Sequence, residues 1–115
     1  MSLEQKITNS RDIKPSSLKI YMSNLHTLYN NIDTPTATFD SVDWLYIYET
    51  HILEFIYQYA PSTQKNYLSA VLVALSTDID KYIDVYERFF AIHKKLADDI
   101  SDEMMSQIKN EKQAK

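Results

Sequence analysis

The complete absence of glycine is the feature that most narrows the folds open to this chain of 115 residues. An average chain of this length would hold about eight glycines. Two-residue hairpin turns and the GxGxxG, Walker A and GxSxG loops all need the backbone freedom that glycine supplies. The composition therefore disfavours hairpin-rich sheets and excludes these three kinds of site. We predict an all-α fold.

Charge and apolar patterning limit the possible partners. There is no cysteine, so disulfides and thiolate metal sites are excluded. No apolar run is long enough to span a membrane and no signal peptide is evident, so we expect an intracellular protein without a membrane partner. The net charge of −4 argues against a simple nucleic-acid binder. Its distribution is uneven, however, because residues 1–31 carry +2 and residues 61–77 carry +1, whereas residues 32–60 carry −5.

Apolar periodicity predicts four main helices and divides the chain into three parts. The helices are expected at about residues 16–29, 43–59, 62–76 and 78–100, with a possible break near residues 48–50 and a loop over 30–42. Residues 1–13 are expected to be a flexible arm, 14–100 the helical domain, and 101–115 a polar tail that extends the last helix or acts as a linker. The expected core positions are Leu18, Tyr21, Met22, Leu25, Leu28, Tyr29, Trp44, Ile47, Ile52, Phe55, Ile56, Tyr59, Tyr67, Leu68, Val71, Leu72, Leu75, Tyr82, Val85, Tyr86, Phe89, Ile92, Leu96 and Ile100.

A short pattern occurs twice, 46 positions apart, starting at Pro15 and at Pro61. Each proline is followed by a Ser-Ser or Ser-Thr pair, and then by a lysine, a tyrosine and a serine at matching offsets. We expect the Ser/Thr pair to cap a helix, and hydroxyls and a lysine near a helix N-terminus favour a phosphate. Capping alone explains one copy, whereas two copies with the same lysine indicate a shared task. The candidate phosphate-binding residues of the two copies are Ser16, Ser17, Lys19, Ser23, Ser62, Thr63, Lys65 and Ser69.

Other groups of reactive side chains have simpler interpretations. The three histidines fall on different predicted helices without paired ligand spacing, so we expect no metal site and no cofactor. The acidic run at 98–103 is expected to be a solvated helix end, and Lys94-Lys95 a surface pair. No serine, histidine and aspartate form a recognisable triad, so we expect no catalytic residue.

Both copies of the pattern, together with the segments between them, resemble a known family. Ser16-Ser17-Leu18-Lys19-Ile20-Tyr21 followed by Leu25, and Ser62-Thr63-Gln64-Lys65-Asn66-Tyr67-Leu68-Ser69-Ala70, are similar to the first and third helices of the core-binding domain of tyrosine recombinases, the phage-integrase type. Asp43-Trp44-Leu45 and Ile52-Leu53-Glu54-Phe55-Ile56 resemble the segment between. The likeness covers about residues 14–100 and is nearest to the versions found in large DNA viruses and mobile elements.

The resemblance implies duplex-DNA binding at a recombination site. In that family the domain is a compact SAM-like bundle of four to five helices, so the resemblance implies that fold here. The domain forms half of a clamp around DNA, and its first and third helices approach the major groove and the flanking backbone. Matched position by position, Ser17, Lys19 and Ile20 lie near DNA on the first helix. Thr63, Lys65 and Asn66 occupy the equivalent places on the third helix. The implied partners are duplex DNA, a catalytic domain of the same protein, and other recombinase protomers on the DNA.

Two departures from the family pattern keep another function open. The chain is acidic, which predicts weak DNA affinity by itself. It also lacks the family's catalytic arginine, His-x-x-Arg and tyrosine set, since its only arginines are Arg11 and Arg88, so we expect no enzymatic activity from these residues alone. The competing hypothesis is a helical protein–protein interaction module that uses the acidic segment and the tyrosine-rich surface; an independent enzyme is a third.

Overall fold

The structure is a computed structural model that describes the backbone of residues 2–33 and 35–114 and the side chains of residues 2–33 and 35–98. Over that described backbone it contains helices and no strand, so the all-α prediction is confirmed. The elements, in chain order, are α1 (Leu3–Ser10), α2 (Pro15–Asn30), α3 (Asp43–Ile47), α4 (Glu49–Ile56), α5 (Pro61–Leu75), the 3-10 turn η1 (Ser76–Asp78) and α6 (Ile79–Ala114).

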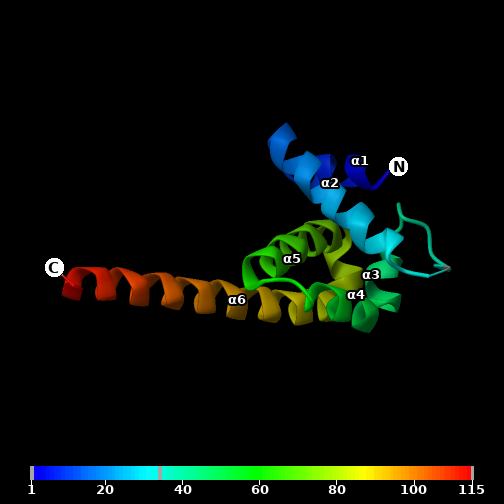
Figure 1. Cartoon of the computed structure of the whole chain (residues 1–115). Coiled ribbons are helices and arrows are strands. Elements are labelled where there is room, and N and C mark those ends of the chain that lie inside the picture. The colour runs from blue at the N-terminus through cyan, green and yellow to red at the C-terminus, as the bar shows by residue number, and fades with distance from the viewer. Residues whose placement is uncertain (1, 34, 115) are drawn as a thin grey trace.

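Helix α5 is the centre of the bundle. Its second half is buried on every side from Ala70 to Leu75, as expected for a helix covered by neighbours all round. Helix α6 lies along it, and α2 crosses it (Figure 1). The predicted common core is confirmed, because Leu68 of α5 and Phe89 of α6 are both fully buried in the same cluster. Trp44 and Val71 belong to that cluster too, and Tyr67 packs against it partly buried.

Two predicted core residues prove to be exposed. Ile47 is 52% exposed and Tyr59 is 38% exposed. The predicted helix over 43–59 breaks at Tyr48, which has φ −107° and ψ 26°, so the apolar stripe changes phase there. Because α3 ends before this break, its buried face need not continue that of α4: in α3, Leu45 rather than Ile47 turns inward beside Trp44. Tyr59 follows the end of α4, and its ring packs at a tilt of 46° against that of Tyr67 instead of entering the core.

Residues 3–10, which were expected to belong to a flexible arm, form helix α1. Leu3 and Ile7, one turn apart, are both fully buried in the common core. Ser2 caps the helix through a capping box with Gln5. A helix of eight residues is too short to show an apolar periodicity in the sequence. Only the tertiary contacts show that two buried apolar side chains are enough to hold α1 against the bundle.

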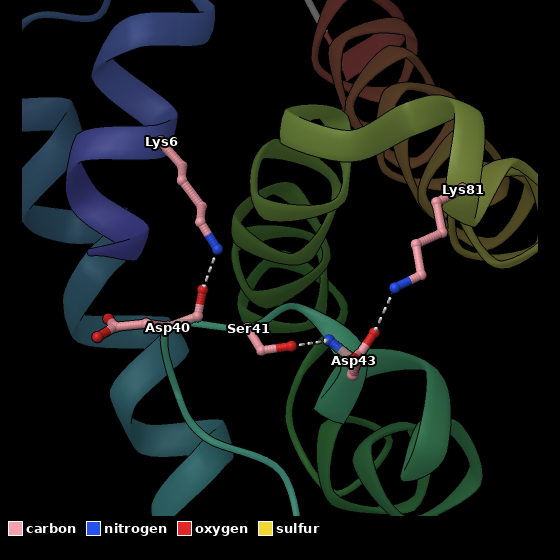
Figure 2. A network of polar contacts seen from close by, with 5 residues as sticks. All are labelled: Lys6, Asp40, Ser41, Asp43 and Lys81. Carbon is pink, nitrogen blue, oxygen red and sulfur yellow. Dashed lines mark hydrogen bonds and ion pairs between the residues drawn. The ribbon is translucent and has the colours of Figure 1, made fainter. Parts of the chain in front are cut away.

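Polar contacts tie α1 and α3 to the rest of the bundle (Figure 2). The backbone N–H of Leu3 donates to the carboxylate of Asp40 at 3.1 Å, and the Lys6 ammonium donates to the Asp40 carbonyl at 2.7 Å. On the other side of the same loop, Lys81 of α6 pairs with Asp43 of α3 at 3.4 Å. The loop between α2 and α3 is therefore held from both sides, and Ile32 and Val42 within it are buried.

Helix α6 is longer than the sequence pattern indicates. Its backbone stays helical to Ala114, so the predicted polar tail continues the helix. One irregular residue, Tyr82 with φ −117° and ψ 25°, lies near its start. The C-terminal half extends beyond the packed helices in Figure 1. The predicted burial of Ile100 lies outside the described side chains.

Candidate functional site

The two copies of the repeated pattern form the first turns of α2 and α5, as predicted, but their hydroxyls do not cap the helices. The N-cap residues are Lys14 and Ala60, and neither makes a side-chain capping bond. Proline occupies the first helical position in both, where its fixed φ suits the helix and its missing N–H costs nothing. The Ser/Thr pairs therefore follow the cap, within the first turn, and the capping prediction is wrong.

Corresponding residues in the two first turns share the same exposure. Ser16 and Ser62 are exposed, whereas Ser17 and Thr63 are half-buried. The first intrahelical hydrogen bonds are donated by Leu18 and by Gln64, so the N–H groups of the preceding hydroxyl residues come before the helical ladder begins. The sequence repeat thus corresponds to a repeat of local geometry.

A shallow hollow of about 200 Å³ joins the two helices. It is lined by Ser17, Ile20 and Tyr21 of α2 and by Asn66 and Ser69 of α5. Four of the ten predicted site residues therefore line one surface, although they come from segments far apart in the sequence. Ile20 is 58% exposed at this place, an unusual position for a large apolar side chain.

The remaining six predicted residues do not line this hollow. Lys19 and Ser23 are exposed on the outer face of α2, opposite its buried stripe, and Lys65 is half-buried on α5. Ser16, Ser62 and Thr63 lie in the first turns of the two helices. The site is thus a surface of two helix ends and not a closed pocket.

A second hollow, of about 310 Å³, adjoins the first and adds positive charge. Its lining includes Ser17 and Tyr21, which it shares with the first hollow, and also Arg11, Asp12, Ile13 and Lys14. Sequence reasoning missed Arg11 as a site residue because it assigned residues 1–13 to an arm, and it did not include Lys14 among the site residues although it placed that residue in the helical domain. The charge of +2 over residues 1–31 was the signal that pointed to this region.

His93 of α6 also reaches this surface. Its Nε2 atom lies 3.0 Å from Oγ of Ser69, which lines the first hollow. Partial burial, followed by the nearby ammonium of Lys65, lowers the pKa of His93 below its ordinary value. Sequence reasoning considered this histidine only as a metal ligand, because nothing in the spacing between residues 69 and 93 indicates their contact.

The other two histidines lie in unrelated environments. His26 stacks on Phe39 with ring centroids 4.1 Å apart, and His51 contacts the side chain and carbonyl of Asn31. Within the described part of the chain, no group of three or more histidine, cysteine, aspartate or glutamate side chains could hold a metal ion. Over those same residues, no helix has the length and apolarity that crossing a membrane requires.

A further hollow, of about 460 Å³, lies away from these helix ends, between α3 and α6. Its lining consists of Asp43, Tyr46, Ile47, Lys81, Tyr82, Asp84 and Val85. Tyr46 is 58% exposed and Ile47 52%. Beside them, Arg88 of α6 makes a bidentate ion pair with Glu49 of α4, with both N–O distances 2.7 Å. This surface is largely apolar, and its border carries charges of both signs.

Comparison of the chain with known protein families, with curated proteins and with solved structures gives no match. The similarity to recombinase core-binding domains therefore remains a prediction from the residues quoted above.

Proposed function

We propose that this domain binds duplex DNA through the first turns of α2 and α5, as the non-catalytic, core-binding half of a tyrosine recombinase. The observation that carries the proposal is the shared hollow in which Ser17 and Ile20 meet Asn66 and Ser69. Two copies of one sequence pattern there present hydroxyls, an amide and nearby lysines on a single surface. A catalytic domain of the same protein and other protomers on the DNA complete the proposed assembly.

Most polar groups on this surface are cations or hydrogen-bond donors that can contact DNA phosphates, and only one of them is proposed to contact a base. Lys14, Lys19 and Lys65 supply cations, and Arg11 adds a guanidinium that matches phosphate geometry. The serine and threonine hydroxyls and the first-turn N–H groups are donors of the kind that commonly contact phosphate oxygens. Asn66 is exposed and its amide can pair with adenine in the major groove, so it is the proposed base reader.

The net charge of −4 limits the affinity of the isolated domain. We expect non-specific binding on the order of 10⁻⁴–10⁻⁶ M at physiological salt, strengthening as salt falls because bound counterions are released from the DNA.

The test measures the affinity for a fluorescent 20-base-pair duplex by anisotropy over a series of salt concentrations. Lys19→Ala and Lys65→Ala should each flatten the slope of log K against log salt by about one unit, since each removes one phosphate contact. Lys81→Ala is the matched control. It removes the same charge from the side of α6 that faces α3, where Lys81 pairs with Asp43, and it should leave the slope unchanged.

Two results would contradict the proposal: no binding at low salt, or equal slopes for the Lys19/Lys65 double variant and the unaltered protein. Asn66→Ala should change the preference among duplex sequences more than it changes the salt slope.

The alternative function, a protein-interaction module, is favoured by the exposed Tyr46 and Ile47 beside the hollow of about 460 Å³. Mapping backbone amide shifts separates the two functions. DNA should shift residues 16–23 and 62–69, whereas a protein partner held at α3 should shift residues 43–47 and 81–85.

A further inference from the structure

Ser69 occupies a central place in the proposed DNA surface. Its side chain lines the hollow with Ser17 and Ile20 of α2, and its Oγ contacts Nε2 of His93 on α6. Three helices therefore contribute to the surroundings of one hydroxyl group. His93 is only partly buried, so its imidazole is accessible to a ligand that enters from solvent.

The surroundings of His93 on its own helix lack a negative charge. The side chains one turn away on either side, at i±3 and i±4, are Phe89, Phe90, Leu96 and Ala97. The nearest carboxylates in the helix, Glu87 and Asp98, are six and five residues away and lie on other faces. Lys94 and Lys95 follow directly and are exposed.

The neighbouring helices supply positive charge and no carboxylate. Lys65 and Tyr67 are the ionisable residues of α5, and the ammonium of Lys65 acts on His93. Helix α2 contributes Lys19, Tyr21, His26 and Tyr29 and contains no acidic residue. Asp78 of η1 directly precedes the start of α6, 15 residues before His93 in the sequence, and Asp12 lines the adjoining hollow together with Arg11 and Lys14.

We infer that His93, Ser69 and Lys65 form a phosphate subsite for the DNA backbone, and that His93 takes up a proton when a phosphodiester occupies it. The inference rests on the proposed DNA binding and extends it to a third helix. Protonated imidazole has two N–H donors and no acceptor. Its Nε2–H then donates to Oγ of Ser69, which leaves the serine hydroxyl hydrogen free to donate to a phosphate oxygen.

Proton uptake links DNA affinity to pH in a defined direction. A phosphodiester beside His93 favours the charged imidazole and raises the pKa of His93 in the complex above its value in the free protein. The affinity for DNA is then constant at pH values above the pKa of His93 in the complex. It increases as the pH falls below that value, and it levels off below the pKa of His93 in the free protein. A difference of one unit between the two pKa values corresponds to tenfold tighter binding at low pH.

The experiment measures affinity for the same 20-base-pair duplex between pH 8.0 and pH 5.5 at constant ionic strength. We expect about tenfold tighter binding at pH 5.5 for the unaltered protein. His93→Gln keeps an amide that can contact Ser69 but does not titrate, so its affinity should change far less with pH. His51→Gln removes an exposed histidine from α4 and should keep the full response. The imidazole resonances of His93, followed by NMR with and without DNA, should show its pKa rising in the complex.

The outcomes separate this inference from the function on which it rests. If no variant binds the duplex at either pH, the proposed DNA binding fails and the subsite fails with it. If the unaltered protein and His93→Gln bind with the same pH response, or if DNA leaves the pKa of His93 unchanged, the subsite is overturned while DNA binding stands.

Discussion

Replacing Ile7 by alanine tests the part of the fold in which the structure and the sequence pattern disagree most. Ile7 is fully buried, and the substitution removes three carbon atoms from its side chain. At about 0.8 kcal/mol for each buried carbon, the lost transfer free energy is about 2.4 kcal/mol. Incomplete collapse around the cavity adds to this, and the total cost for Ile→Ala in a core reaches up to about 5 kcal/mol. The short terminal helix can relax, so we expect a value near the lower figure.

Thermal and urea unfolding, followed by circular dichroism at 222 nm, measure this change. An unfolding entropy of about 2.1 cal/mol/K per residue gives about 0.24 kcal/mol/K for 115 residues, so a loss of 2.4 kcal/mol lowers Tm by about 10 °C. Ile20→Ala is the matched control, because it makes the same truncation at a side chain that is 58% exposed. It should change stability by no more than about 0.5 kcal/mol. A similarly small effect of Ile7→Ala would refute the docking of α1 and restore the flexible arm.

Three further substitutions or conditions test the core and the ionisation of His93. Leu68→Ala should cost about 2–5 kcal/mol by urea unfolding, since Leu68 is fully buried in α5, and a loss below about 0.5 kcal/mol would show that the buried face is assigned wrongly. Trp44→Phe removes the indole N–H that donates to the carbonyl of Phe39 at 3.1 Å, and it should cost about 1–3 kcal/mol because that partly buried carbonyl loses its partner. The folded-state pKa of His93 lies below its ordinary value of 6.5, so the unfolded chain binds more protons as pH falls past that value. The urea midpoint should therefore decrease from pH 7.5 to pH 5.5 and level off below the folded-state pKa; an equal decrease in His93→Gln would contradict this assignment.

Local sequence signals determined the four main helices, because each has an apolar stripe of helical period that any neighbour must cover. The same signals predicted the interruption near residue 48 and the exposed side of α2. They did not determine how α3 is oriented relative to α4, since a single irregular residue at Tyr48 changes the helical phase between the two helices. The buried face of α3 is therefore set by its own packing, which buries Leu45 and leaves Ile47 exposed, whereas one continuous helix over residues 43–59 was expected to bury Ile47.

The N-caps of α2 and α5, and the short helix α1, are features that local sequence rules did not predict correctly. Both Pro-Ser pairs satisfy the pattern of a helix start, but proline at the first helical position moves the cap back to Lys14 and Ala60. Helix α1 offers only Leu3 and Ile7 as apolar anchors, and a helix this short gains its stability from tertiary packing.

The sequence alone determined that two helices begin with the same types of side chain, because the repeat of proline, hydroxyl residues and lysine is visible without any structure. Only the tertiary structure decided that these ends form one surface, since Ser17 and Asn66 meet through the crossing of α2 over α5. The same holds for the contact between Ser69 and His93, which depends on how α6 packs along α5. Periodicity specifies which face of a helix is apolar; the packing of complete helices specifies which polar side chains become neighbours across them.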